Sequence, residues 1–402
     1  MAPLRSFTDR AIVFLALGET LVWAGLFYLF PALLVQWEEA LGWSKAELTG
    51  AVTLALLLSA LASPYARRMI DAGKGAQLMA GCAGIGGLSL FALSAVTALW
   101  QFYLAWAVIG IATAGCLYEP CFAIVTRARG ASAKQGIIAI TLIAGFASAI
   151  SFPLAHILSE NFDWRFAVQV FAVIVTFAGA PLLWAGVRQV ERGRPVASTE
   201  SLEKTVPRYA FLNRSSFWFL ALAFAFAALL HRATVHHLLP ILYDRGVSSQ
   251  MAIAAASFIG PMQVAGRLLV MASDRHMSNH GVAIACFSLM GVSIVLLFAS
   301  GLGLGILIGF VVLFGGAYGT ASIVRPLIAR DVLGEANFGA KTGALALLFL
   351  AGSALAPYLG SLVWSAGGYD LVLSCLIILS VVGLILYLVA HRHSQQPARA
   401  DQ

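Results

Sequence analysis

Charged residues are scarce in this sequence, at 11% of its 402 residues, whereas 60% are hydrophobic. A soluble domain carries roughly a quarter charged residues. This composition, with a mean hydropathy of +0.88, therefore excludes a soluble protein and predicts a polytopic membrane protein. The net charge of +7 has the sign that nucleic acid attracts. The basic residues lie between the apolar runs, however, and we expect no nucleic-acid partner.

Several functional signatures are missing as well. The chain has no nucleotide-binding loop, which argues against an ATP-driven pump, and no HExxH-like helix or acidic cluster, which argues against a membrane-embedded enzyme. No re-entrant filter of the kind that channels use is visible. The glycine-rich stretches 81–87 and 301–305 lie within apolar runs and predict close helix packing. We expect neither a cofactor nor a metal ion.

Cysteine is infrequent, and its five positions argue against a disulfide framework or a zinc site. All five lie inside apolar runs, and their number is odd. We interpret them as small core residues. They are Cys82, Cys116, Cys121, Cys286 and Cys375.

Twelve apolar runs are long enough to cross roughly 30 Å of hydrocarbon as helices. They are 11–35, 46–66, 77–98, 102–126, 136–158, 165–187, 215–242, 249–272, 281–300, 303–329, 340–362 and 370–390. The first run is too long for a signal-peptide core, and we expect it to remain as a span. The sequence predicts an all-α protein with a six-helix bundle over 1–187, a cytoplasmic linker over 188–214, and a second six-helix bundle over 215–402 that ends in a short cytoplasmic tail.

Lysine and arginine indicate the orientation. With the N-terminus inside, nineteen of the 25 basic residues fall on the cytoplasmic side and three fall outside, with three more inside spans. The outer three are Lys45, Arg165 and Arg245, and those within spans are Arg232, Arg267 and Arg325. Because cytoplasmic loops carry the excess of basic residues, we expect a protein of the cytoplasmic (inner) membrane with both termini in the cytoplasm.

The two halves repeat one another. Glu119-Pro120 in the fourth span corresponds to Arg325-Pro326 in the tenth, so a charge stands directly before a proline in each half. Other matching positions are Pro31 with Pro240 and Pro153 with Pro357. Six spans duplicated in parallel are typical of a transporter whose site lies between its halves.

Local motifs support this interpretation. The loop after the second span reads Ala66-Arg67-Arg68-Met69-Ile70-Asp71-Ala72-Gly73-Lys74, and its counterpart contains Gly266-Arg267 and Asp274-Arg275. Asp163-Trp164-Arg165 precedes the sixth span. With these motifs the chain resembles the major facilitator superfamily over nearly its whole length, although one glycine and one arginine of the loop pattern are replaced. The resemblance implies a gating role for Arg68, Asp71, Arg267 and Asp274, although the position of Arg267 near the end of its span also fits a structural or snorkelling residue.

The resemblance further implies that the first, fourth, seventh and tenth spans line a central cavity. Helical spacing shows which residues share a face of each span. The candidate substrate-binding or coupling residues are Glu19, Trp23, Phe27, Tyr118, Glu119, Phe122, Arg232, His236, Tyr318, Ser322 and Arg325. His231 and His237 cluster with His236, but their spacing suits no metal site, and His236 alone shares a stripe with Arg232.

Glu19 and Glu119 are the only acids within the spans away from their ends, where Glu47 and Asp370 stand. A buried charge costs several kcal/mol without a partner, water or a ligand. Two interpretations stay open: permanent structural ion pairs, Glu119 with Arg325 and Glu19 with Arg232, or carboxylates that take up and release a coupling proton as their partners move.

These observations predict a secondary active transporter, acting as a monomer in the lipid bilayer on a small-molecule substrate. The two acids and the arginines Arg232 and Arg325 sum to zero charge, which favours a neutral or zwitterionic solute held by aromatic stacking. If Arg267 also reaches the cavity, the net charge of these side chains becomes +1, which favours an organic anion as the substrate. The chain broadly resembles porters of the monocarboxylate-related branch and bacterial riboflavin importers. We favour riboflavin uptake, with a monocarboxylate-type anion or drug efflux as alternatives.

The charge bias generates a topology prediction. Reporter fusions after Arg194 and at the C-terminus should both report a cytoplasmic location. An external signal at either position would contradict the assignment of spans.

A second prediction concerns the matched charges. Glu119→Gln should leave Arg325 without a counter-charge, and Arg325→Gln should strand Glu119, so each single variant should lose most transport. The double variant should regain its level in the membrane, because no unpaired charge remains. Recovered protein without uptake would indicate binding or coupling, and recovered uptake would make the pair structural. Normal transport by the single variants would remove the pair from the mechanism.

Overall fold

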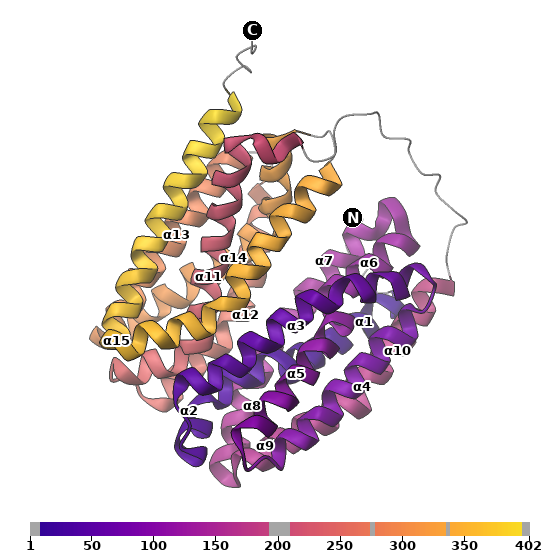
Figure 1. Ribbon diagram of the computed structural model, residues 1–402, viewed down its shortest axis with the longest axis vertical. Coiled ribbons are helices and arrows are strands. Elements are labelled where there is room, and N and C mark those ends of the chain that lie inside the picture. Colours follow the sequence, from indigo (N-terminus) through magenta and orange to yellow (C-terminus); the bar gives the residue numbers. More distant parts are fainter. Residues whose placement is uncertain (1–8, 193–209, 274–277, 335–337, 396–402) are drawn as a thin grey trace. The chain divides into compact units, whose positions relative to one another are not determined.

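The fold is described by a computed structural model, which covers residues 9–192, 210–273, 278–334 and 338–395. Asp274 and most of the predicted linker lie outside the described residues. All the regular elements of the described part are helices (Figure 1). Contacts divide the chain into two compact units, 1–198 with 249–261, and 199–248 with 262–402.

The first unit contains six membrane-length helical segments, four of which are interrupted. Its elements are α1 (Arg10–Trp23), the π-helix η2 (Ala24–Tyr28), α2 (Leu29–Leu41), α3 (Lys45–Asp71), α4 (Gly75–Ser94), α5 (Leu99–Cys116), α6 (Tyr118–Arg129), the 3-10 turn η3 (Gly130–Ser132), α7 (Ala133–Ala144), α8 (Ala147–Asn161), α9 (Trp164–Val173), the π-helix η4 (Ile174–Gly179) and α10 (Ala180–Arg192).

Three of the four interruptions lie shortly before a proline; the fourth, at Gly145-Phe146, does not. Proline has no N–H, so the carbonyl four residues earlier loses its helical donor. The π-helix η2 ends shortly before Pro31, and η4 ends two residues before Pro181. The widened turn in η2 is supported from α8, because the buried hydroxyl of Ser151 donates to the carbonyl of Ala24 at 2.8 Å. Irregular backbone inside a bilayer is tolerated where such partners exist.

The second unit is built from longer, mostly uninterrupted helices. They are η5 (Ala210–Asn213), α11 (Ser215–Asp244), α12 (Ser249–Ser273), α13 (Asn279–Phe298), η6 (Ser300–Leu302), α14 (Leu304–Leu333) and α15 (Phe338–Gln395). The start of α12, residues 249–261, belongs to the first unit, within which the Ser148 hydroxyl of α8 donates to the Ser257 carbonyl at 3.0 Å and accepts from the Gly260 N–H at 3.1 Å.

One long element, α15, contains two spans. Gly367 is extended, and Gly368 has a φ of 67° and a ψ of −168°, a conformation that residues with a side chain rarely adopt. The helix is therefore broken at this point, between the two predicted runs. The eleven membrane-length segments of the described residues thus hold twelve spans, which confirms the predicted all-helical, twelve-span fold.

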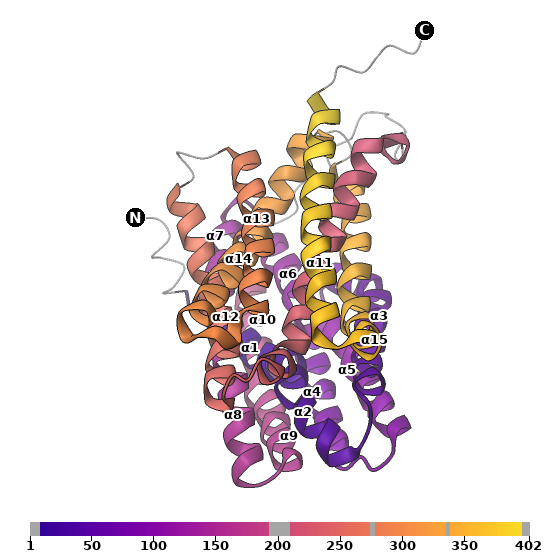
Figure 2. The ribbon, with the colours of Figure 1, turned by 90° about the vertical axis from the view of Figure 1, so that its left-hand side faces the viewer.

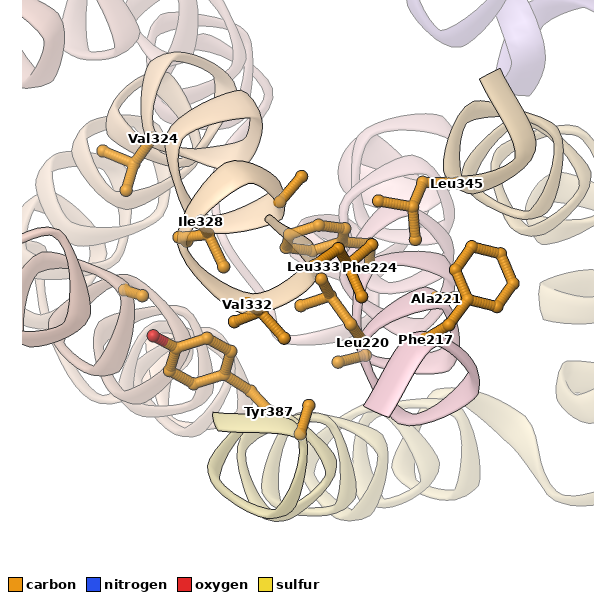
Figure 3. Packing of buried hydrophobic residues seen from close by; sticks show 14 of the residues in the cluster. Phe217, Leu220, Ala221, Phe224, Val324, Ile328, Val332, Leu333, Leu345 and Tyr387 are labelled. Atoms are coloured by element: carbon orange, nitrogen blue, oxygen red, sulfur yellow. The ribbon is translucent and has the colours of Figure 1, made fainter. Parts of the chain in front are cut away.

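Within the second unit, α11 runs alongside α15, and α13 packs against both α14 and α15 (Figures 1 and 2). Figure 3 shows the buried cluster that joins them. Two sets of its labelled residues follow helical spacing: Phe217, Leu220, Ala221 and Phe224 on α11, and Val324, Ile328, Val332 and Leu333 on α14. Leu345 and Tyr387 come from the two parts of α15 on either side of its break. Packing of this kind stabilises helix association in a bilayer.

A close glycine contact is repeated in both units. In the first, a Cβ on Gly110 of α5 would lie 2.2 Å from the Ala55 carbonyl oxygen of α3. In the second, a Cβ on Gly266 of α12 would lie 2.2 Å from the Gly316 carbonyl oxygen of α14. Gly110 and Gly316 each stand nine residues before a charge–proline pair, at Glu119 and Arg325. The repeat inferred from the prolines thus extends to helix packing.

Candidate functional site

Aromatic side chains from the first and fourth spans gather in the first unit. The Trp23 ring lies 5.0 Å from that of Phe27 and 4.8 Å from that of Tyr118, measured between centroids. Tyr118 and Phe122 stack at 5.0 Å with an interplanar angle of 13°. Tyr28 lies 5.1 Å from Phe27. We call these five residues the aromatic cluster; its members belong to η2 and the adjoining ends of α1 and α6.

The fourth span is broken next to this cluster. Leu117 is extended, with a φ of −97° and a ψ of −166°, and separates α5 from α6. Pro120 explains the break, because it cannot donate to the Cys116 carbonyl and its ring would clash with that carbonyl in a continuous helix. As a result Glu119 lies in the first turn of α6 and is exposed. The positive end of the helix stabilises a carboxylate there by about 0.3–1 kcal/mol.

Glu19 has a very different environment. Its side chain is completely buried, and within the described part of the chain neither carboxylate oxygen has a hydrogen-bond partner. Trp23 and Cys121 are the polar side chains beside it, but the contacts lack hydrogen-bond geometry. Buried polar groups in proteins are nearly always paired. An unsatisfied carboxylate is therefore a structural cost that suggests a role other than stability.

In the second unit, Arg232 and Arg325 reach the same helix. The Nε of Arg232 on α11 donates to the Ser353 hydroxyl on α15 at 2.8 Å. The guanidinium of Arg325 on α14 lies 4.0 Å above the ring centroid of Phe349, one turn earlier on α15. Arg232 and Arg325, two of the predicted site residues, thus contact successive turns of α15.

Tyr318 lies against His231, which does not share the helical stripe of Arg232. Its ring stacks on that of His231 with 3.3 Å between centroids and an angle of 6°. Phe314 stacks on the same imidazole at 5.3 Å. Helical spacing favoured His236, whose Nδ1 lies 2.9 Å from the Arg232 carbonyl oxygen on its own helix. The pairing of His231 with Tyr318 depends on how α11 packs against α14, which spacing along one helix does not reveal.

Ser322, His237 and Arg267 of the second unit have different surroundings. The Ser322 hydroxyl donates to the Gly319 carbonyl of its own helix at 2.7 Å. Nε2 of His237 lies 2.9 Å from the Pro357 carbonyl oxygen on α15. Arg267 is buried in α12. Hydrogen bonding of His237 to a proline carbonyl indicates a structural residue.

The loop after α3 is fastened by a residue outside the predicted gating set. Arg68 and Asp71 are exposed, whereas Arg127 of α6 donates to the carbonyls of Ile70 and Asp71, the latter at 3.0 Å. A cation at the C-terminal end of a helix is favourable. Arg127 therefore closes the end of α3, a contact between spans that the loop motif alone does not predict.

The candidate residues accordingly fall into two groups, one in each unit. Glu19, Trp23, Phe27, Tyr118, Glu119 and Phe122 belong to the first, and Arg232, His236, Tyr318, Ser322 and Arg325 to the second. The ion pairs of Glu119 with Arg325 and of Glu19 with Arg232 stay predictions. In the described residues, no group of three or more His, Cys, Asp or Glu side chains is placed to hold a metal ion.

The burial of Glu19 generates a prediction about stability. Glu19→Met removes an unsatisfied polar group and keeps a similar volume, so the free energy of unfolding should stay the same or rise by about 1–3 kcal/mol. Thermal unfolding of the purified protein in detergent measures this. Glu47→Met is the matched control: Glu47 accepts from the Ser44 N–H at 2.8 Å, so loss of this half of the capping box should lower the free energy of unfolding. Strong destabilisation by Glu19→Met would show that the carboxylate has a stabilising partner.

Comparison with known proteins agrees with this architecture. The family model of the Major Facilitator Superfamily matches residues 15–271. No curated protein matches the chain. Two solved structures of a bacterial homolog of the human lysosomal transporter Spinster, inward-facing and either occupied or unoccupied, superpose with a TM-score of 0.69. The two structures are 16% and 15% identical to this chain in sequence. Each alignment covers 99% of this chain and 100% of the solved one. At this level of identity the similarity concerns the fold. Because the family model spans more than half of the sequence, the chain belongs to the major facilitator superfamily.

Proposed function

We propose that the protein is a secondary active transporter that imports riboflavin, or a similar aromatic and nearly neutral nutrient, by alternating access. The observation that carries the proposal is the aromatic cluster, which combines side chains of two interrupted spans. The working unit is a monomer in the cytoplasmic membrane with both termini in the cytoplasm.

Stacking is the interaction that would select such a solute. Trp23, Tyr118 and Phe122 are half-buried, so each ring keeps an accessible part. An offset or edge-to-face aromatic contact contributes about 0.5–1.5 kcal/mol beyond the area that it buries. Two or three such contacts would bind a planar aromatic solute even if the site carried no net charge.

The interrupted spans supply the polar groups and the mobility that transport needs. Discontinuous helices are common at transporter binding sites, where helix ends face the substrate. The exposed Glu119 at the start of α6 is placed to accept a hydrogen bond or a proton. We assign Glu119 and Arg325 to coupling, with a proton as the coupling ion.

A second candidate is an organic anion of the monocarboxylate type. It is supported by the two guanidinium groups that successive turns of α15 hold, at Ser353 and Phe349. Guanidinium groups bind carboxylates through paired hydrogen bonds. Glu19 is also completely buried, so its carboxylate is not accessible to a solute and does not repel an anion by direct contact.

Growth of a riboflavin auxotroph that lacks its own importer tests the proposal. Expression of the protein should restore growth on low external riboflavin. Trp23→Leu should abolish the rescue, because Trp23 contacts both Phe27 and Tyr118. Trp100→Leu is the matched control and should retain it, since that side chain is 66% exposed on the first unit.

The outcome also separates the two candidates. Absence of rescue despite normal protein in the membrane, together with accumulation of labelled lactate, would replace the aromatic nutrient by the organic anion. Counterflow of preloaded solute in vesicles would then identify a carrier.

A further inference from the structure

Two histidines meet where α13 begins and α15 ends, away from the residues discussed above. The imidazole rings of His280 and His391 stack with 3.7 Å between centroids and an interplanar angle of 15°. Nδ1 of His280 lies 2.8 Å from the hydroxyl oxygen of Tyr387. These contacts connect the first turn of α13 to the end of α15.

Tyr387 holds the pair in a fixed place. Its side chain is 1% exposed, and its ring stacks on that of Phe287 at 5.5 Å. The ring belongs to the buried cluster of the second unit (Figure 3). The hydroxyl is therefore a rigid partner for His280, and His280 is held against His391.

An acidic side chain completes the surroundings. Asp331, at the end of α14, accepts a hydrogen bond from Nδ2 of Asn279 at 2.9 Å and acts electrostatically on the Tyr387 hydroxyl. In the described part of the chain, the other titratable or charged side chains near these helix ends include Arg330 on α14 and Arg392 and His393 on α15, which are exposed. Lys341 at the start of α15 is buried, and its Nζ donates to the carbonyls of Leu333 and Gly334 at the end of α14. One nearby carboxylate can balance one protonated imidazole.

The helix ends distinguish the two histidines. His280 follows the N-cap Ser278 by two residues, and a cation is unfavourable at the N-terminal end of a helix. His391 lies one turn before the last residue of α15, where a cation is favourable. A proton on His280 is therefore opposed by the end of α13, and also by any charge on the stacked ring of His391.

We propose that His280 and His391 form a proton-controlled clasp, which joins α13 to α15 while at most one imidazole is protonated and opens when both are. An unperturbed histidine titrates at about pH 6.5. The clasp is therefore closed at neutral pH and opens in acid, which makes the helix ends of the second unit sensitive to the pH of the compartment that they face. This inference does not depend on which solute is transported.

Metal binding is a poorer explanation of the same pair. The nitrogen lone pairs of imidazole lie in the ring plane, and two nearly parallel rings 3.7 Å apart direct them along parallel planes. One ion at about 2.0–2.1 Å from both nitrogens would require the rings to turn away from each other.

Hydrogen–deuterium exchange of the purified full-length protein tests the clasp. Between about pH 7.5 and about pH 5.0, protection of the amides in 279–290 and 385–395 should fall about tenfold, after correction for intrinsic exchange. His280→Gln and His391→Gln each leave a single imidazole, so either variant should lose this pH response. His393→Gln is the matched control on the same helix and should respond as the unmodified chain does.

Two results would overturn the inference. One is equal protection of both segments at the two pH values in the unmodified protein. The other is a tenfold loss in acid that persists in a folded His280→Gln or His391→Gln variant, which would assign the response to other groups. Either substitution alone is sufficient for the test.

Discussion

The rest of the structure depends on one constraint: backbone N–H and carbonyl groups must find hydrogen-bond partners within the protein, because the interior of a lipid bilayer supplies none. Inside a bilayer each unpaired carbonyl or N–H costs several kcal/mol, so a helix can be interrupted only where another group replaces the missing partner. The first unit meets this condition at η2, where Ser151 supplies a hydroxyl to the Ala24 carbonyl. The aromatic cluster exists because the interruption is stabilised, and its residues come from the turns that the interruption rearranges.

The two units meet this constraint in different ways. Pro120 and Pro326 stand at matching places after a charge, yet α5 and α6 are divided at Leu117 whereas α14 continues through Pro326. Near-identical sequence signals thus lead to different backbones, so a proline by itself does not decide whether a span is divided. The charged residues differ accordingly: Glu119 lies in a first turn, and Arg325 lies in mid-helix above Phe349.

Much of the fold follows from the sequence alone. Run lengths gave the twelve spans, and Gly367-Gly368 falls between the last two predicted runs. Helical spacing also selected Trp23 and Phe27 on one span, and Trp23 meets Tyr118 of another. Spacing describes one helix at a time, however. It could not reveal that Tyr318 stacks on His231 rather than lying beside His236, nor that Arg127 closes the end of α3.

The repeated glycine contact has a mechanical consequence. At Gly110 and Gly316 the backbones of neighbouring helices touch without intervening side chains, so each contact can serve as a pivot. At about 1.5 Å per residue, a side chain nine residues further along lies roughly 13 Å from it. A rotation of about 10° there displaces the far end by about 2 Å, which is enough to make or break a hydrogen bond. On the continuous α14, Arg325 lies at that distance from Gly316, so a small rotation at this glycine would be converted into a change of contact at the Arg325 guanidinium. In the first unit the break at Leu117 lies between Gly110 and Glu119, so a rotation at Gly110 would act on the break before it reached Glu119.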